Sequence, residues 1–231
     1  MIITLSGMFG AGRSTVANLL CARINKYLDA QATTPWYELS FLRKHFSIRK
    51  GEQKYRRWSG GDAWEEEAKK RGITIKELSA LSKKEPGIHD LVDDRLKEFK
   101  PDTDCLVIDA LLGYLFVPEG KNHFRVYLDV SQIEGGRRIY EQQQVALRDP
   151  TKTKRTDEPN YNSPAEAQEY RHRQLIDIWR GSVIDKYGKL GDKADFLNRH
   201  NYDLIINTDH VSAEEVADGI FGLVKNRLKT A

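Results

Sequence analysis

The chain has 231 residues, enough for one domain of ordinary size that carries a small insertion. Hydrophobic residues make up 39% and charged residues 31%, which is typical of a globular protein and excludes a fibrous or disordered chain. No apolar run approaches the length of about 18 residues that a membrane span needs, and no basic segment precedes the apolar N-terminal run. We therefore expect a cytoplasmic protein with no membrane partner. The net charge of +3 predicts no stable nucleic-acid partner.

Short apolar runs that are typical of strands occur at residues 1–6, 105–109, 124–129 and 202–207. Helical patterns separate them, beginning with residues 14–28. Runs that are apolar on both faces are typical of parallel strands covered by helices on both sides. The sequence therefore predicts an α/β fold with a doubly wound parallel sheet and helices on both faces.

The last helix is expected to begin at Ser212, because Ser212 and Glu215 have the spacing of a capping box. Its predicted buried stripe consists of Val216, Ile220, Leu223 and Val224. Cys21 lies in an apolar helix pattern and Cys105 in an apolar strand pattern, so we interpret both as small buried hydrophobic residues and as neither a disulfide nor a metal site.

Two connections are longer than a simple crossover requires. Residues 35–100 have a helical pattern with few strand signals, which predicts a helical insertion. Residues 148–164 are polar and contain three prolines, which predicts a mobile loop between two helices.

A glycine-rich segment follows the first predicted strand. Residues 7–15 match the P-loop pattern G-x-x-x-x-G-K-[ST], except that Arg13 stands in place of the lysine. Backbone N–H groups between a strand and a helix N-terminus can converge on a phosphate, and Ser14 is placed to bind Mg²⁺. A glycine-rich turn without a ligand is the alternative. The candidate phosphate-binding residues are Gly7, Gly10, Ala11, Gly12, Arg13, Ser14 and Thr15.

Two aspartates follow predicted strands at the carboxyl edge, where open α/β sheets bind ligands. Asp109 could hold Mg²⁺ through water or orient an acceptor, with a helix-capping role as the alternative. Asp129 precedes a predicted helix, and for this residue capping is the favoured interpretation.

Several blocks spread over the chain resemble the cytidylate kinases, particularly the short archaeal type within the nucleoside monophosphate kinase group. Besides the P-loop, the similar blocks are residues 59–64, 85–95, 126–129 and 202–208. The resemblance implies a single kinase domain over residues 1–231, in which 35–100 bind the acceptor nucleotide and 141–180 form a lid. It also implies transfer of the γ-phosphoryl group of ATP to CMP or dCMP, with Mg²⁺ as cofactor and a small nucleotide as the partner.

Phosphoryl transfer depends mainly on positioning and positive charge, which directs attention to arginines. By resemblance, Arg138, Arg173 and Arg180 are candidate catalytic lid residues, together with Arg13. The candidate acceptor-binding residues are Arg57, Ser59, Asp62, Asp93 and Asp109. A solvated charged face is the alternative for the lid arginines, and a solvated basic segment with Trp58 packed on the core is the alternative for Arg57.

The chain departs from the family pattern where three arginines are expected. Gly135 stands at the first arginine position of the lid helix, Glu65 at an acceptor-phosphate position, and residues 109–111 lack the arginine of a Glu-x-Arg motif. Two further hypotheses therefore stay open: a P-loop kinase for another small acceptor, and a nucleotide-binding module without catalytic activity.

Overall fold

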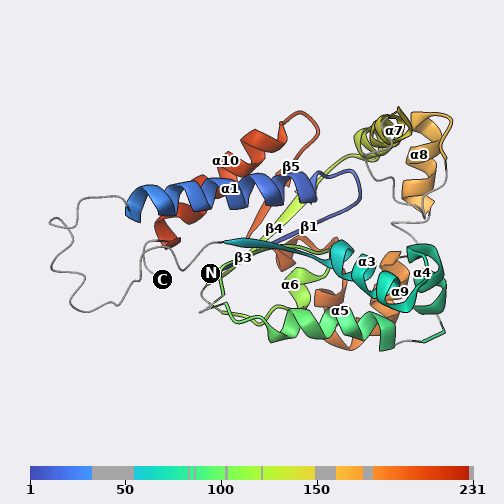
Figure 1. The fold of residues 1–231 in the computed structure, drawn as a ribbon, viewed down its shortest axis with the longest axis horizontal. Coiled ribbons are helices and arrows are strands. Elements are labelled where there is room, and N and C mark those ends of the chain that lie inside the picture. Colours follow the sequence, from blue (N-terminus) through green and yellow to red (C-terminus); the bar gives the residue numbers. More distant parts are fainter. Residues whose placement is uncertain are drawn as a thin grey trace, which may run out of the picture.

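The computed structural model describes residues 1–32, 55–82, 84–85, 87–101, 104–120, 122–148, 160–173 and 179–228. Its centre is a five-stranded parallel sheet with the strand order β2-β3-β1-β4-β5 (Figure 1). The strands are β1 (Ile2–Gly7), β2 (Arg56–Ser59), β3 (Leu106–Asp109), β4 (His123–Asp129) and β5 (Leu204–Asn207). The predicted doubly wound parallel sheet is confirmed.

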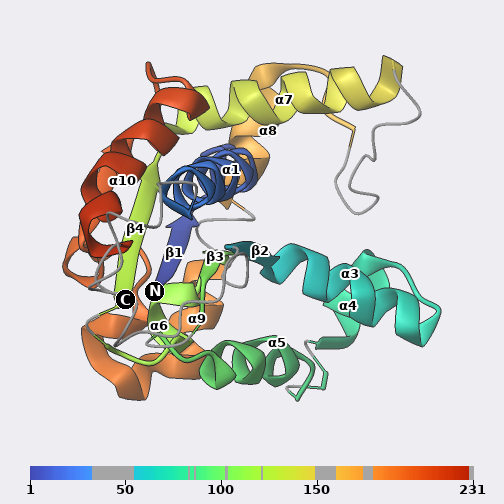
Figure 2. The same ribbon diagram turned by 60° about the vertical axis from the view of Figure 1, so that its left-hand side comes forward.

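One face of the sheet is covered by α1 (Arg13–Ala32) and α10 (Ala213–Leu228), which pack against each other (Figures 1 and 2). Side chains alternate between the two faces of a strand, so Ile3 and Leu5 of β1 point to this side. They meet Val16 and Leu20 of α1 and Ile220 of α10 in a fully buried core. This packing holds the N-terminal end of α1 directly behind the end of β1.

The opposite face is covered by α5 (Gly87–Glu98) and the short α6 (Gly113–Phe116), and α9 (Trp179–Tyr187) lies on the same side (Figure 2). Ile2 and Ile108 pack there against Leu96 and Phe116. A second cluster on this side contains Tyr114 together with Phe196 and Leu197, which lie between the 3-10 segments η2 (Gly188–Ala194) and η3 (Arg199–Asn201). Helices therefore cover both faces, as the strand patterns predicted.

The insertion between β1–α1 and β3 contains an unpredicted strand. Residues 56–59 form β2, which extends the sheet at its edge beside β3, and then come α3 (Gly60–Arg71), α4 (Ile75–Ser82) and α5. Whereas α3, α4 and α5 are helices as predicted, the prediction of a helical insertion did not include this strand. The reason is physical: an edge strand of Arg-Arg-Trp-Ser needs no continuous apolar face, because one side of it is exposed. Residues 33–54 lie outside the described part of the chain.

Helix α7 (Gln132–Arg148) follows β4 and packs against α8 (Pro164–Tyr170), away from the main body of the sheet (Figure 1). Ser163 caps α8, because its Oγ accepts from the backbone N–H of Glu166 at 3.2 Å and Pro164 occupies the first turn. The mobile loop predicted at 148–164 falls largely on residues 149–159, which lie outside the described residues.

The C-terminal helix shows where local sequence signals succeed and fail. The capping box is confirmed, since Ser212 and Glu215 bond reciprocally at 2.8–3.2 Å. Leu223 is 56% exposed, so its predicted place on the buried stripe was wrong.

The two cysteines form no disulfide with each other: Cys21 is buried and Cys105 half-buried, and both are free thiols. No helix among the described residues is long and apolar enough to cross a membrane.

Candidate functional site

The predicted P-loop connects the central strand β1 to α1. Gly10 and Gly12 both have φ of +83°, a left-handed conformation that a side chain would strain. A Cβ atom on Gly10 would also lie 2.6 Å from the carbonyl oxygen of Gly135 in α7. Glycine therefore lets the loop pass directly against α7 while α1 begins at Arg13.

Three side chains converge on the carboxylate of Asp109 at the end of β3. Ser14 Oγ donates to Oδ2 at 2.5 Å, Arg57 Nη2 donates to the same oxygen at 3.1 Å, and Arg13 Nε lies 3.4 Å from Oδ1. The Asp109 side chain is only 3% exposed. The alternative in which Asp109 caps a helix was therefore wrong: its carboxylate joins the P-loop to the insertion.

These residues fit a Mg²⁺–phosphate group. In P-loop proteins Mg²⁺ is held by the serine or threonine of the loop and by an aspartate at a strand end, and Ser14 already contacts Asp109. Among the described residues no cluster of three or more His, Cys, Asp or Glu side chains could bind a metal by itself. One hydroxyl and one carboxylate suit Mg²⁺, which keeps several waters and takes further oxygens from phosphates.

Arg57 also reaches the insertion, where its Nη1 lies 3.2 Å from Asp62 Oδ2. Ser59 caps α3 by accepting from the N–H of Asp62 at 3.2 Å, so its hydroxyl has a structural partner. Beside these residues lies a cavity of about 420 Å³. Its lining combines basic, acidic and aromatic side chains, among them Arg57, Trp58, Asp62, Arg95, Glu98 and Phe99.

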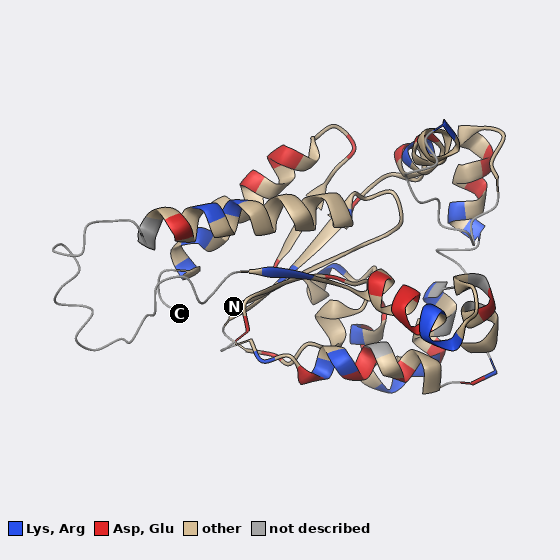
Figure 3. Ribbon diagram, viewed as in Figure 1, with Lys and Arg blue, Asp and Glu red and all other residues tan. Residues whose placement is uncertain are grey.

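Trp58 packs edge-on against Phe99 with ring centroids 5.6 Å apart, and it belongs to the core beside β3. The alternative of a solvated basic segment with Trp58 packed on the core holds for Trp58 but not for Arg57, which pairs with Asp109 and Asp62. Figure 3 shows β2 as a basic strand, while α3 and α5 carry residues of both signs. Positive charge thus reaches the carboxyl edge of the sheet from β2 and from the P-loop.

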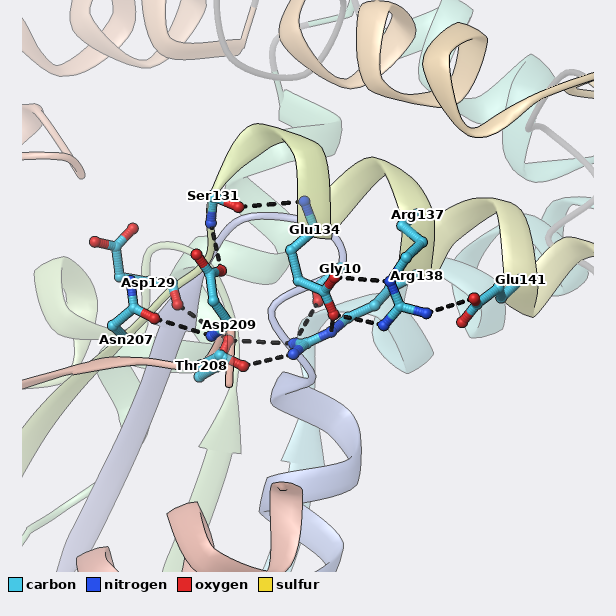
Figure 4. A network of polar contacts seen from close by, with 10 residues as sticks. All are labelled: Gly10, Asp129, Ser131, Glu134, Arg137, Arg138, Glu141, Asn207, Thr208 and Asp209. Atoms are coloured by element: carbon cyan, nitrogen blue, oxygen red, sulfur yellow. Dashed lines mark hydrogen bonds and ion pairs between the residues drawn. The ribbon is translucent and has the colours of Figure 1, made fainter. Parts of the chain in front are cut away.

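The side chain of Arg138 contacts the backbone of the P-loop. Its guanidinium donates to the carbonyl of Gly10 at 3.3 Å and to that of Thr208 at 2.5 Å, and Glu134 accepts from its Nε at 2.7 Å (Figure 4). Hydrogen bonds from Arg137 and Arg138 lower the pKa of Glu134 to about 2. Arg138 therefore ties α7 to the glycine loop and to the segment after β5.

The end of β4 is organised by Ser131 rather than by Asp129. Ser131 Oγ accepts from the N–H of Glu134 at 3.2 Å, while the Ser131 N–H donates to Asp209 at 2.8 Å (Figure 4). The Asp129 carbonyl accepts from Thr208. The predicted capping role of Asp129 was therefore wrong, because the serine two residues later has the geometry of an N-cap.

Residues 174–178, which separate Arg173 from Arg180, lie outside the described part of the chain, and with them the helix predicted to hold both arginines. Arg173 follows α8, is exposed, and forms a 3.9 Å ion pair with Glu169. Arg180 lies on α9 and pairs with Asp195 at 2.5 Å. Asp93 faces α9 from α5, where Tyr187 donates to it and burial raises its pKa. The structure therefore brings together Arg13, Ser14, Arg57 and Asp109, but not these three residues.

Arg171 was missed by the sequence analysis. It is 1% exposed, and its Nε donates to the carbonyl of Phe9 in the P-loop at 2.8 Å. No local pattern could have found it, because the contact joins positions that are 162 residues apart. The available signal was Gly135, whose missing side chain leaves the space that Arg171 occupies.

A parallel sheet with a P-loop after its central strand, and with an aspartate at the neighbouring strand end, defines an α/β P-loop fold of the kinase type. The shikimate kinase from Bacteroides thetaiotaomicron superposes with a TM-score of 0.51 at 14% identity, over 97% of this chain and 98% of that chain. An uncharacterized protein from Eubacterium ventriosum gives a TM-score of 0.50 at 14% identity, over 97% and 98%. These similarities show the fold.

No family model matches the chain. It is 29% identical to an S-adenosylmethionine-dependent nucleotide dehydratase of Lacinutrix mariniflava over 94% of its own length, and it spans only 34% of that relative. A cytidylate kinase of Halobacterium salinarum is 26% identical over 80% of this chain and 78% of that protein. A cytidylate kinase of Methanosphaera stadtmanae is 23% identical over 98% and 99%. The comparisons thus support a P-loop kinase.

Proposed function

We propose that the protein is an ATP- and Mg²⁺-dependent phosphotransferase that moves the γ-phosphoryl group of ATP to a nucleoside monophosphate, with CMP and dCMP as the first acceptors. The observation that carries this proposal is the Asp109 carboxylate, which contacts Arg13 and Ser14 of the P-loop on one side and Arg57 of the insertion on the other. A transferase needs this connection, because donor and acceptor must be aligned at one point.

In this proposal Ser14 and Asp109 hold Mg²⁺, which would neutralise charge on the phosphates. Arg13 takes the place of the P-loop lysine: it keeps the positive charge and offers a planar fork of donors. Arg57 supplies positive charge on the acceptor side, where Glu65 replaces an arginine expected from the family pattern. The cavity beside Arg57 offers aromatic walls and a second cation, Arg95, which suits a base and a phosphate.

The domain assignment is part of the same proposal. Residues 35–100 would contain the acceptor-binding insertion, of which β2 and α3 to α5 are described. Residues 141–180 would form the lid, with Arg173 and Arg180 in it and Arg138 just ahead of it as candidate phosphate contacts. A nucleotide acceptor is favoured over shikimate because the similar cytidylate kinases and the nucleotide dehydratase are named for nucleotides.

The test is ADP production from ATP and Mg²⁺ with CMP, dCMP, UMP, AMP, GMP or shikimate as the acceptor. We expect acceptor-dependent ADP with CMP or dCMP. Turnover with shikimate alone would support a P-loop kinase for another acceptor. Binding of ATP without turnover on any acceptor would favour the non-catalytic module and refute the proposal.

A pair of variants tests the acceptor side. Arg57→Ala should raise the KM for the acceptor more than the KM for ATP, because Arg57 comes from the insertion and lines the cavity beside it, whereas Asp109 keeps its contacts with Ser14 and Arg13. Arg56→Ala is the matched control, since Arg56 is the exposed neighbour on the same strand. Equal effects of the two substitutions would contradict the role of Arg57.

A further inference from the structure

The buried arginine behind the P-loop, Arg171, links three segments. Its Nε donates to the Phe9 carbonyl at 2.8 Å, and its Nη2 donates to the Val130 carbonyl at 3.4 Å. Phe9 belongs to the glycine loop and Val130 directly follows β4. One side chain therefore fixes the loop against the end of the neighbouring strand.

Stability does not explain why an arginine occupies this place. Burial lowers the pKa of Arg171, and its Nη1 is buried without a hydrogen-bond partner among the described residues. An unpaired buried donor destabilises a protein, and apolar residues of similar volume often replace buried ions without loss of stability. The guanidinium of Arg171 is thus better explained by the Phe9 and Val130 carbonyls that it holds in place than by a contribution to folding stability.

The space for this guanidinium exists because residue 135 is glycine. A Cβ atom at Gly135 would lie 2.7 Å from Arg171 Nε and 2.8 Å from Cζ. The carbonyl of Gly135 in turn lies where a side chain on Gly10 would be. Helix α7, Arg171 and the P-loop are therefore packed in direct contact.

The contact with Phe9 bears on how the loop can bind phosphate. In a trans peptide unit the C=O and N–H groups point in opposite directions, so the bond to the Phe9 carbonyl turns the Gly10 N–H away from Arg171. A phosphate-binding loop needs N–H groups that face the ligand and carbonyls that face away from it. Arg138 bonds the next carbonyl, that of Gly10.

We propose that Arg171 is a positioning residue of the phosphate site, which sets the geometry of the P-loop by holding the Phe9 carbonyl in the space that Gly135 leaves open. This role rests on the phosphate site of the proposed function, but it does not depend on which acceptor is used or on whether transfer occurs. Arg171 would act through the loop without touching the phosphates.

The first experiment measures the Kd of Mg²⁺–tripolyphosphate for Arg171→Met, Arg171→Lys and the wild type, together with the melting temperature without ligand. We expect Arg171→Met to bind about 10- to 100-fold more weakly, as when a supporting group behind a binding site is lost. Its melting temperature should stay close to that of the wild type, which a merely structural residue would not allow. Arg171→Lys, with its charge and a donor for Phe9, should recover part of the affinity.

The matched control is Arg137→Met, which removes an exposed arginine that pairs only with Glu134 and Glu141 among its described contacts. It should bind tripolyphosphate like the wild type. A folded Arg171→Met protein with unchanged affinity would overturn the proposal. If Arg171→Met melts too low to be measured, Gly135→Ala decides, because it displaces the guanidinium without removing it, and wild-type affinity in that variant would overturn the proposal.

The second experiment moves the guanidinium without removing its charge. Gly135→Ala should displace Arg171 and weaken tripolyphosphate binding, whereas Gly219→Ala, a helical glycine with open space around its Cβ position, should not. In the Arg171→Met background Gly135→Ala should cause little further loss. Full additivity of the two changes would show that they act independently and would contradict the proposed pairing.

Failure of this inference can be told apart from failure of the proposed function. Tripolyphosphate binding needs neither an acceptor nor turnover. A wild-type protein that binds tripolyphosphate but phosphorylates no nucleotide refutes the proposed transferase and leaves the role of Arg171 supported or overturned by the variants alone.

Discussion

The hydroxyl of Ser14 donates to the carboxylate of Asp109 over 2.5 Å, although the two residues are 95 positions apart. The sheet creates this proximity, because β1 and β3 are hydrogen-bonded neighbours and Leu5 lies opposite Asp109 in their register. The P-loop therefore begins beside the strand end that carries Asp109. A change at either residue should alter the same phosphate site.

The substitution Asp109→Asn should lower both stability and turnover. It removes the counter-ion of Arg13 and Arg57, and removing one partner of a buried ion pair is strongly destabilising. Loss of one preorganised charge contact in the transition state commonly costs about 100- to 1,000-fold in rate. Thermal denaturation and ADP production measure the two effects. Asp94→Asn, on an exposed helix face, is the control, and a wild-type rate in Asp109→Asn would contradict the role of Asp109.

Ser14→Ala should weaken the Mg²⁺-dependent part of ATP binding while the fold stays intact, because the hydroxyl is exposed to the site and is not part of the core. Calorimetric titration with ATP in Mg²⁺ and in a chelator separates the two parts. Equal losses with and without the metal would exclude Ser14 as a metal ligand.

Substitutions at Arg13 test whether the protein is an enzyme or a nucleotide-binding module without catalytic activity. The guanidinium of Arg13 pairs with the carboxylate of Asp109 and lies 5.9 Å from the centre of the Phe9 ring in the P-loop. Arg13→Ala should reduce phosphoryl transfer by about 100- to 1,000-fold, and Arg13→Lys should retain or increase it. ADP release with and without CMP or dCMP measures both. An Arg13→Ala protein as active as the wild type would rule out a role in transfer.

His123 should make stability dependent on pH. Burial lowers its pKa from 6.5 to about 4, with the charge of Arg125 as a second cause, so the native protein keeps it neutral where the unfolded chain becomes protonated. This stability is present above pH 6.5 and is lost as the pH falls towards 4, by about 3 kcal/mol in unfolding free energy. Urea denaturation of the wild type and His123→Asn over this range gives the difference.

The exposed His200 supplies a control through His200→Asn, which should retain the acid sensitivity of the wild type. If His123→Asn loses as much stability on acidification as the wild type does, His123 is not the group responsible.

Local patterns predicted the elements that are locally encoded. The strand before Gly7, the helix from the P-loop and the capping box at Ser212 each follow from neighbouring residues, and each is found. Strand β2 was missed because its polar edge position leaves no apolar pattern to detect. Leu223 was misplaced because helical periodicity shows which residues share a face but not where the packing surface ends.

The candidate site was predictable only in part for a related reason. Ser14 and Asp109 were identified separately, since one lies in a motif and the other ends an apolar strand. Their contact and the approach of Arg57 depend on strand order, which residue spacing does not specify. Gly135 was interpreted as a lost arginine, whereas the fold delivers another arginine, Arg171, to the same place from the segment after α8.

The contact between Gly135 and Arg171 should produce correlated substitutions at these two positions among related sequences. Any side chain at position 135 would occupy the volume of the guanidinium, so an arginine at 135 and an arginine packed as in this chain at 171 exclude each other. Among descendants of a common ancestor the two positions should therefore change together, and an arginine at one should accompany a small or differently packed residue at the other. A chain that gained a side chain at position 135 while keeping Arg171 would have a displaced guanidinium behind its phosphate site, so a change at 171 should come first or together with the change at 135.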